Sequence, residues 1–237
     1  MENELTIRLS AFLVLFLLFA LLESYWPRRK RVYSRLSRWP THWAITAINA
    51  LILRALSFGL PLLAVGAALD ASQSGLGLFN HLNWPIWVEF TICVLVLDFS
   101  IWVQHLITHK VPVLWRLHRV HHSDEDMDVT TAIRFHPVEI ALSMFLKIGL
   151  VYLIGPAALA VIVFEVLLNG TAMFNHANIS IPKPIDAVLR KVIVTPDMHR
   201  IHHSKIRLEH DSNYGFALSI WDRIFGTYTN VPQEGHE

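Results

Sequence analysis

The stretch Asp98–His122 reads Asp-Phe-Ser-Ile-Trp-Val-Gln-His-Leu-Ile-Thr-His-Lys-Val-Pro-Val-Leu-Trp-Arg-Leu-His-Arg-Val-His-His. It contains a His-x-x-x-His pair and, after a proline, a His-x-x-His-His box. Its five histidines are His105, His109, His118, His121 and His122. The segment His199–His203 repeats the His-x-x-His-His spacing near the other end of the chain. The rest of the sequence can be interpreted around these histidines.

The spacing of these histidines is typical of helices that hold a metal. Each residue of a helix turns by about 100°, so side chains three or four apart share one face. Neutral imidazole is the commonest metal ligand among side chains. One box supplies too few ligands for a closed site, so several must meet. The eight imidazoles of the pair and the two boxes are too many for one ion, and we expect two ions.

The identity of the metal stays open at this point. Nitrogen ligands suit zinc, copper, iron or nickel, and the spacing does not separate a di-iron centre from a di-zinc one. A shared thiolate is excluded because the only cysteine, Cys93, lies inside an apolar run. Four of the six histidines outside these patterns are expected to be ordinary polar residues: His42, His81, His210 and His236.

The composition predicts an integral membrane protein. Hydrophobic residues make up 53% of the 237 residues and charged residues only 16%, outside the usual soluble balance. Residues 11–22 carry no charge, and with their flanks they reach the roughly 20 residues of a spanning helix. Only Arg8 precedes this run, whereas six basic residues follow it: Arg28, Arg29, Lys30, Arg31, Arg35 and Arg38. A cleaved signal peptide has the opposite order, so we expect an uncleaved anchor whose C-terminal end is cytoplasmic. At this position the basic run favours lipid head groups over nucleic acid.

Further apolar runs predict the other spans. We expect a second span from about Trp43 to Leu69 with a kink at Pro61, a third from Trp84 toward His105, and a hairpin of Val138–Ile154 and Ala157–Phe174. The predicted fold is an all-α integral membrane bundle of four to five spanning or partly spanning helices. Alternating crossings bring the histidines and the C-terminus to the cytoplasmic side, as a metal-binding cap. We expect residues 1–89 to form N-terminal spans with a basic loop, residues 90–230 a catalytic domain, and residues 231–237 a tail.

Acidic residues near the boxes are candidates for supporting roles. Asp98 lies seven residues before His105, on nearly the same helical face, so it can hydrogen-bond a ligand imidazole. The segment Ser123–Asp128 is expected to be a solvated acidic loop, or a docking site for a basic electron-donor protein. Asp197 and Asp222 are further candidates for orienting ligands or for docking.

Over residues 90–230 the sequence resembles the fatty acid hydroxylase superfamily, which includes sterol desaturases and alkylglycerol monooxygenase. The resemblance is carried by Asp98 with the His105–His109 pair, by the two boxes with Thr195-Pro196 before the second, and by the segments Arg134–Glu139, Asn175–Asn178, Asn213–Gly215 and Trp221–Gly226. These segments occur in the family's order. The first ninety residues match only as generic spans.

The resemblance implies a di-metal centre, taken to be di-iron, that uses O2 to hydroxylate or desaturate a lipid. The implied ligands are His105, His109, His118, His121, His122, His176, His199, His202 and His203. His136 stands in the family's Phe-His-Pro element and is either a tenth ligand or a pocket residue; with Asp98 and Asp197 it forms the expected catalytic set. Fatty acid 2-hydroxylases carry His-x-x-x-His where this chain has His176 followed by Ser180, which weakens that assignment.

The implied chemistry requires an external electron donor, and the sequence also leaves an alternative function open. The sequence has no GxGxxG, flavin or haem motif, so both electrons come from an external donor of the ferredoxin or cytochrome type. The rival is a membrane zinc protein that uses the same histidines as a transporter or hydrolase, and the purified protein can carry zinc. Transport sites usually lie inside the spans, whereas these histidines cluster beyond the span ends. A hydrolase needs a carboxylate base, for which Glu139 or Glu165 is available.

Overall fold

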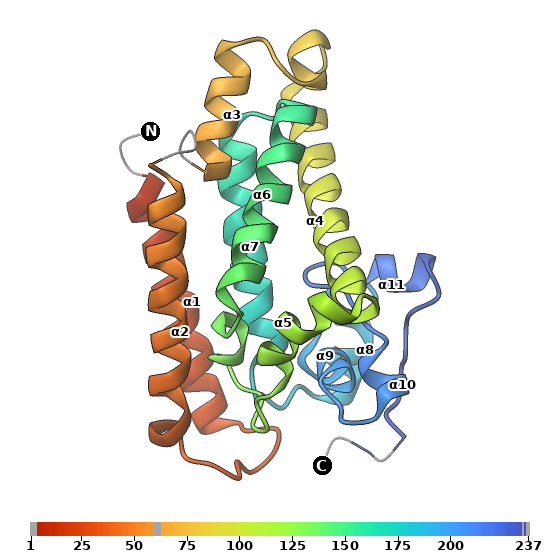
Figure 1. Ribbon diagram of the computed structural model, residues 1–237. Coiled ribbons are helices and arrows are strands. Elements are labelled where there is room, and N and C mark those ends of the chain that lie inside the picture. The colour runs from red at the N-terminus through yellow and green to blue at the C-terminus, as the bar shows by residue number, and fades with distance from the viewer. Residues whose placement is uncertain (1–3, 59–62, 234, 236–237) are drawn as a thin grey trace.

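The computed structural model describes residues 4–58, 63–233 and 235, which form an all-helical protein (Figure 1). The helices are α1 Glu4–Tyr25, α2 Arg35–Leu56, α3 Leu63–Gln73, α4 Ile86–Lys110, α5 Pro112–His122, α6 Pro137–Ile154, α7 Ala158–His176, α8 Lys183–Leu189, α9 Pro196–His202, α10 Arg207–His210 and α11 Ile220–Ile224, with short 3-10 turns at Leu78–His81 and Thr131–Ile133. Among the described residues, strand-like pairing is limited to two isolated bridges, Pro27 with Ile179 and Ile193 with Leu218.

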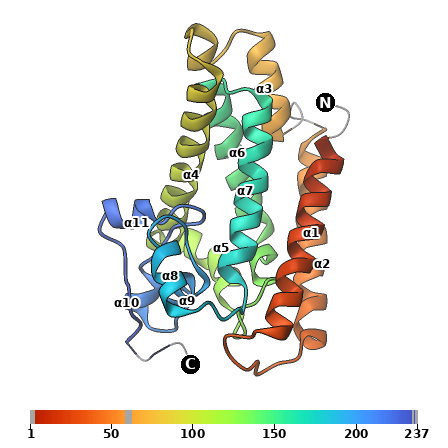
Figure 2. The ribbon, with the colours of Figure 1, turned by 180° about the vertical axis from the view of Figure 1, so that it is seen from behind.

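Four of these helices, α1, α4, α6 and α7, are long and apolar enough to cross a membrane. The predicted helical membrane bundle is therefore confirmed, and the chain is a multi-pass membrane protein. Helices α1 and α2 run side by side along one flank of α6 and α7, while α4 lies on the other flank (Figures 1 and 2). Helix α3 packs against α6 and α7 at the end of the bundle where α4 begins.

The expected second span, Trp43 to Leu69, is wrong as a single helix. Helix α2 ends at Leu56 with Ser57 as its C-cap, and α3 is a separate helix that begins at Leu63. The expected kink at Pro61 lies outside the described residues. Helix α2 returns along α1 and packs on it through aromatic rings, with Phe16 centred 5.7 Å from Trp39 and 5.1 Å from Trp43. This hydrophobic packing places the basic start of α2 beside the end of α1.

The predicted hairpin is confirmed as α6 and α7. Pro137 occupies the first turn of α6, where its missing N–H is not needed. Gly155 ends this helix in the left-handed conformation, with φ 64°, which glycine adopts at little cost. A side chain at Gly77 would collide with the backbone of Gly155. The tip of the hairpin therefore packs directly on the loop before α4.

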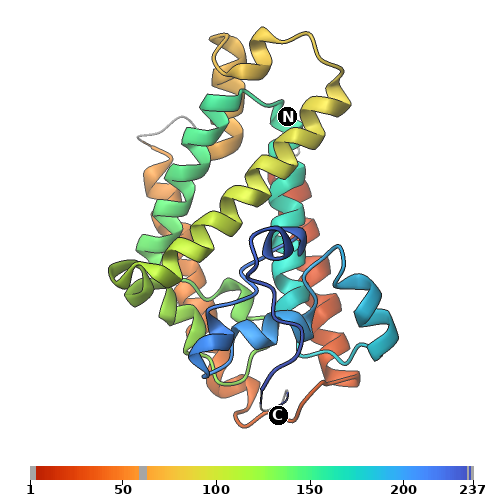
Figure 3. The same cartoon turned by 90° about the vertical axis from the view of Figure 1, so that its right-hand side faces the viewer.

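The short helices α5 and α8–α11 gather at the opposite end of the bundle and form the cap (Figure 3). Proline starts both helices that carry the boxes, Pro112 in α5 and Pro196 in α9. In α9, the Thr195 side chain accepts a hydrogen bond from the Met198 backbone N–H at 3.4 Å, as an N-cap does. Each box thus lies at the C-terminal end of a short helix that begins with a proline.

The acidic segment Ser123–Asp128 is exposed at Ser123 and Glu125 but is not the fully solvated loop that the sequence predicts. Asp126 and Asp128 are buried, because the segment after α1 folds over them. Arg38 binds Asp124 and Asp128, the latter at 2.9 Å. The Val32 backbone N–H donates to Asp126 at 2.9 Å. The charges that suggested a docking site are therefore used to join the N-terminal helices to the cap.

Candidate metal centre

The nine histidines implied by the resemblance converge in the cap and form two groups. The five-histidine group consists of His105, His109, His118, His122 and His202. The four-histidine group consists of His121, His176, His199 and His203. Within each group, one ring nitrogen per residue lies within 4.8 Å of those of all the others. Two compact sets of imidazoles fit two metal ions better than one.

Each His-x-x-His-His box is divided between the two groups. In α5, His118 and His122 are one turn apart and join the five-histidine group, whereas His121 joins the other. At the end of α9, His202 joins the five-histidine group and His203 the other. The ring centroids of these two neighbours are 5.5 Å apart. The two groups are therefore adjacent and share the helices that build them.

Protein acceptors orient three imidazoles of the five-histidine group. The Nδ1 atoms lie 2.7 Å from the Tyr214 carbonyl for His105, 2.6 Å from Glu139 Oε1 for His118 and 2.7 Å from the Ser212 carbonyl for His202. Each acceptor fixes the proton on Nδ1, which leaves the lone pair on Nε2. These three Nε2 atoms are buried and make no hydrogen bond. Histidines that bind metals in proteins have this arrangement.

The four-histidine group is held together differently. His176 Nδ1 donates to the Ala172 carbonyl at 2.7 Å. Its Nε2 lies 3.0 Å from His121 Nε2 and 3.1 Å from His199 Nε2. Ligands at right angles around an ion, with bonds of roughly 2.1 Å, are about 3 Å apart. The three nitrogens therefore have the spacing of ligands on a common ion.

The charge state of the cap histidines suits a metal. Burial, together with the neighbouring imidazoles, holds the pKa well below its usual value for five of them, His121, His122, His199, His202 and His203. These rings are neutral at pH 7 and offer lone pairs. A purely nitrogen donor set fits a first-row transition metal. Buried lone pairs without donors are costly, and a bound cation would satisfy them.

Asp222 supports the five-histidine group indirectly. Its buried carboxylate accepts hydrogen bonds from the Tyr214 backbone N–H at 2.9 Å and from the Trp102 indole at 3.0 Å. Burial raises the pKa of Asp222, and hydrogen bonds such as that from Trp102 oppose this effect. Because the Tyr214 carbonyl accepts from His105, Asp222 fixes the loop that orients this imidazole.

The three residues expected to be catalytic lie outside both groups. The expected hydrogen bond from Asp98 to an imidazole is not formed, because its Oδ2 accepts from the Trp221 indole at 2.8 Å and its Oδ1 has no partner. His136 caps α6, where its Nδ1 accepts from the Val138 backbone N–H at 3.2 Å. Asp197 pairs with Arg28 at 3.0 Å. These contacts are structural, and any catalytic role of the three stays a prediction.

Two contributors to the site were missed from the sequence. The sequence offers Glu139 as a hydrolytic base and as the end of the Arg134–Glu139 segment, yet in the structure it hydrogen-bonds His118 from 21 residues away. His210 was considered an ordinary polar residue, yet its ring stacks on Trp115 and lies 5.8 Å from that of His109. Both are set apart from the boxes in the sequence, so spacing gave no signal. Of the other isolated histidines, His236 lies outside the described residues.

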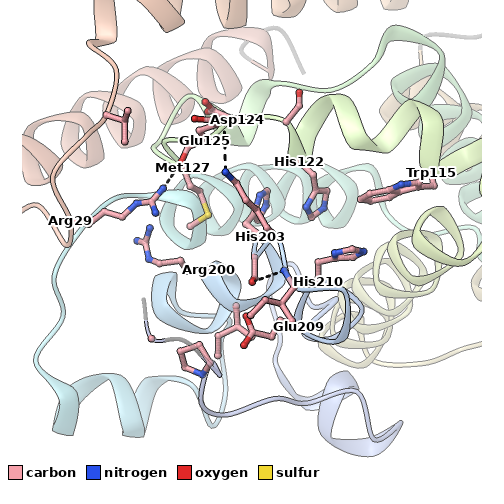
Figure 4. Close-up of a pocket in the computed structure, with 18 residues that line it drawn as sticks. Arg29, Trp115, His122, Asp124, Glu125, Met127, Arg200, His203, Glu209 and His210 are labelled. Atoms are coloured by element: carbon pink, nitrogen blue, oxygen red, sulfur yellow. Dashed lines mark hydrogen bonds and ion pairs between the residues drawn. The ribbon is translucent and has the colours of Figure 1, made fainter. Parts of the chain in front are cut away.

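The histidines can be approached from two sides. A cavity of about 340 Å³ between the long helices is lined by His105 and His118, and by apolar side chains such as Phe12, Met144 and Leu168. On the other side, a depression of about 820 Å³ in the cap reaches His122 and His203 (Figure 4). Trp115, Arg200 and His210 also line this depression. The histidine groups therefore lie between a cavity within the helical bundle and a depression in the cap.

Comparison with known proteins places these features in a family. The sequence model of the fatty acid hydroxylase family, "Fatty acid hydroxylase", matches residues 90–227. Ornithine lipid hydroxylase OlsE of Rhizobium tropici is 27% identical over 196 residues, which cover 81% of this chain and 57% of that protein. Alkylglycerol monooxygenase is 34% identical over 155 residues in both Xenopus tropicalis and Homo sapiens, covering 64% of this chain and 31% and 33% of those proteins.

The chain therefore spans between about a third and just over half of the length of these relatives. No solved structure matches it significantly. The family model extends over more than half of the sequence and includes all nine grouped histidines. This chain belongs to the fatty acid hydroxylase family.

Proposed function

We propose that the chain is a membrane-bound oxygenase that hydroxylates or desaturates a C–H bond of a lipid with O2. The single observation that carries the proposal is that a cavity between the long helices reaches the five-histidine group, with His105 and His118 among its lining residues. Related chains named as lipid hydroxylases and monooxygenases support it. The nine grouped histidines are the proposed ligands of two iron ions, although the purified protein can carry zinc.

The balance of the reaction defines what must be supplied. Hydroxylation combines a C–H bond, O2, two electrons and two protons, and yields an alcohol and water; desaturation yields a double bond and two waters. Bound iron would supply the oxidising power that no side chain has. The residues of the chain hold the lipid in the cavity, orient the imidazoles and limit water. His105 and His118 line the cavity, so the reacting C–H bond is proposed to lie beside them.

The electrons are proposed to come from an external ferredoxin-type or cytochrome-type donor at the outer depression. This depression is lined by His122 and His203, one from each group (Figure 4). A donor on this side would approach the centre without displacing the lipid. The buried aspartates of Ser123–Asp128 are no longer candidates for this contact, because Arg38 and the neighbouring backbone already bind them.

We place the cap and the C-terminus on the cytoplasmic side. Arg28, Arg29 and Arg38 bind the cap through Asp197, Asn178 and Asp124 respectively. The basic segment and the cap therefore lie on the same side of the membrane. Basic residues next to spans favour the cytoplasm, which supports this orientation.

The alternative function as a hydrolase requires a carboxylate base, for which Glu139 and Glu165 are the candidates. The Glu139 carboxylate hydrogen-bonds His118. The Glu165 carboxylate is paired with Lys147 at 2.8 Å and with Arg8 at 2.7 Å. Both acids proposed for this role are therefore engaged in other contacts, and the oxygenase is the better-supported function.

The test is incorporation of labelled oxygen. Protein loaded with iron and placed in lipid nanodiscs would be given a reductase and ferredoxin pair, ¹⁸O2 and a total lipid extract. The expected result is an ¹⁸O-labelled hydroxylated lipid, or a lipid that has lost two hydrogens with matching O2 uptake. A His118→Ala, His202→Ala variant should give neither. An iron-loaded wild-type protein that turns over no lipid with several donors would contradict the proposal.

A further inference from the structure

An ionic cluster occupies the cavity away from the histidines. Arg8 of α1, Lys147 of α6 and Glu165 of α7 all line this cavity. Glu165 pairs with Lys147 at 2.8 Å and with Arg8 at 2.7 Å. The three helices are candidate membrane spans. Ionisable side chains within membrane-spanning helices are costly and usually serve a function.

The cluster is partly open to a ligand. The side chains of Arg8 and Lys147 keep 34% and 11% of their exposure, whereas that of Glu165 keeps only 4%. Both cations bind Glu165, and Arg8 also binds Glu4 at 2.9 Å. An ammonium group has three N–H donors and a guanidinium five, so unused donors remain on both. A cavity end that offers donors fits a ligand with acceptor oxygens.

The cluster and the histidines are separated along the helices. Lys147 is eight residues beyond Glu139 on α6, which is about 12 Å along the axis. Glu139 marks the metal end of the cavity, because it hydrogen-bonds His118. On α7, Glu165 is eleven residues before His176, about 16 Å away along the axis. Apolar residues such as Ile140 and Met144 line the wall between the two ends.

We propose that this cluster is the recognition site for an anionic head group, a carboxylate or phosphate, of a lipid whose chain runs along the apolar wall to the histidines. The inference rests on the proposed function and makes it more specific. Arg8 and Lys147 hold the oxygen atoms, and Glu165 keeps the two cations in place. The oxidised carbon then lies several methylene groups from the head group. Oxidation next to the head group does not fit this separation.

The first test is binding, which requires no turnover. The probe is a long-chain fatty acid with a fluorophore at its methyl end, titrated into metal-loaded protein in nanodiscs without reductant. Lys147→Met should weaken its binding by about tenfold or more, the usual loss for a charged hydrogen bond. The fatty alcohol with the same fluorophore should bind wild type and variant equally. A lysophospholipid with a terminal phosphate provides the second anionic probe and distinguishes phosphate from carboxylate.

Two further variants separate recognition from folding. Lys147→Arg keeps the charge and should retain most of the affinity for the anionic probe. Lys191→Met removes an exposed lysine of the cap and should behave as wild type. Equal binding of the acid by wild type and Lys147→Met would overturn the proposal. An equal loss for acid and alcohol would also overturn it, since Lys147 would then only support the cavity.

The second test is the position of oxidation. Fatty acids of increasing chain length are offered to the iron-loaded enzyme, and the products are located by tandem mass spectrometry. The oxidised carbon should stay at a constant distance from the carboxylate and remote from it. A product oxidised beside the carboxylate would overturn the inference. If no lipid is oxidised while Lys147→Met loses only the anionic probes, the proposed function fails and the recognition site stands.

Discussion

The two histidine groups lie side by side, yet they are supported in different ways. In the five-histidine group, three imidazoles are each fixed by a protein acceptor, the most polar of which is the carboxylate of Glu139 on His118. In the four-histidine group, only His176 has such an acceptor, and its Nε2 faces two other imidazoles directly. The first group is oriented by its surroundings, whereas the second is brought together by the helices that carry it.

This difference coincides with a difference in access. The cavity between the long helices is lined by two members of the five-histidine group, His105 and His118. Hydrogen bonds from outer residues raise the basicity of a ligand and hold its geometry. We therefore expect the five-histidine group to bind its ion more tightly and to face the lipid. The four-histidine group is expected to release its ion more readily.

The largest expected effect comes from two neighbouring residues, one in each group. His202→Ala should remove the ion of the five-histidine group, and His203→Ala that of the other. Each variant should keep about half of the wild-type metal, measured by elemental analysis, and lose lipid oxidation. His81→Ala, at an exposed histidine in a distant 3-10 turn, is the control. Loss of all metal from both variants would show that the groups do not bind independently.

The rate at which a chelator removes each ion should differ between the two groups. In His203→Ala the five-histidine group remains, and in His202→Ala the four-histidine group remains. We expect a chelator to strip the four-histidine group faster by about tenfold, the lower range of effects for lost outer hydrogen bonds. The measurement is the rate of metal transfer to a chromogenic chelator. Equal rates, or the reverse order, would break the comparison.

Glu139 tests the cause of the difference. Glu139→Ala leaves His118 Nδ1 without its carboxylate, so the affinity of the five-histidine group should fall by about 10-fold to 100-fold. Glu139→Gln keeps an acceptor and should lose less. Competitive metal titration of each variant in a His203→Ala background measures this group alone. The control is Glu89→Gln, in the first turn of α4 and far along that helix from His105, which should leave the metal affinity unchanged. An unchanged metal affinity in Glu139→Ala would contradict the role assigned to Glu139.

A smaller effect, on pH dependence, is expected to be common to both groups. Burial and neighbouring imidazoles hold the pKa of His121, His199 and His202 well below the ordinary value. As the pH falls through about 6.5, the unfolded chain binds protons that the folded chain does not. The demetallated protein should therefore lose stability on acidification, by up to about 1.4 kcal/mol per pH unit for each such histidine.

Thermal unfolding of the chelator-treated protein, followed by circular dichroism at several pH values, measures this loss. His81→Gln should show the same pH profile as wild type, because this exposed residue belongs to neither group. A transition temperature that is constant or rises on acidification would show that the imidazoles are not buried in neutral form.

Much of the fold could be predicted because its signals are local. Uninterrupted apolar runs predicted the spanning helices α1, α4, α6 and α7, including the hairpin of the last two, which the structure confirms. The end of α2 at Leu56 was missed because the apolar composition continues beyond it. The burial of Asp126 and Asp128 was missed because their partners lie some ninety residues earlier in the chain.

The candidate site likewise has features that local spacing predicts and features that depend on tertiary structure. Spacing brought the members of each box to one face, but it could not show that His121 and His122 would join different groups. That division depends on how α5, α7 and α9 are oriented toward one another, which is tertiary information. The contact of Glu139 with His118 crosses 21 residues, and the cluster around Glu165 joins three helices. Neither leaves a periodic pattern in the sequence.

The most direct test of the two-group account is the metal content per chain. The protein would be purified in mild detergent from iron-supplemented cells. Iron and zinc would be measured by mass spectrometry, and the protein concentration by amino-acid analysis. The account predicts about two ions per chain, with about one left in His203→Ala. One ion in the wild-type protein, or none, would contradict the assignment of these histidines to two metal sites.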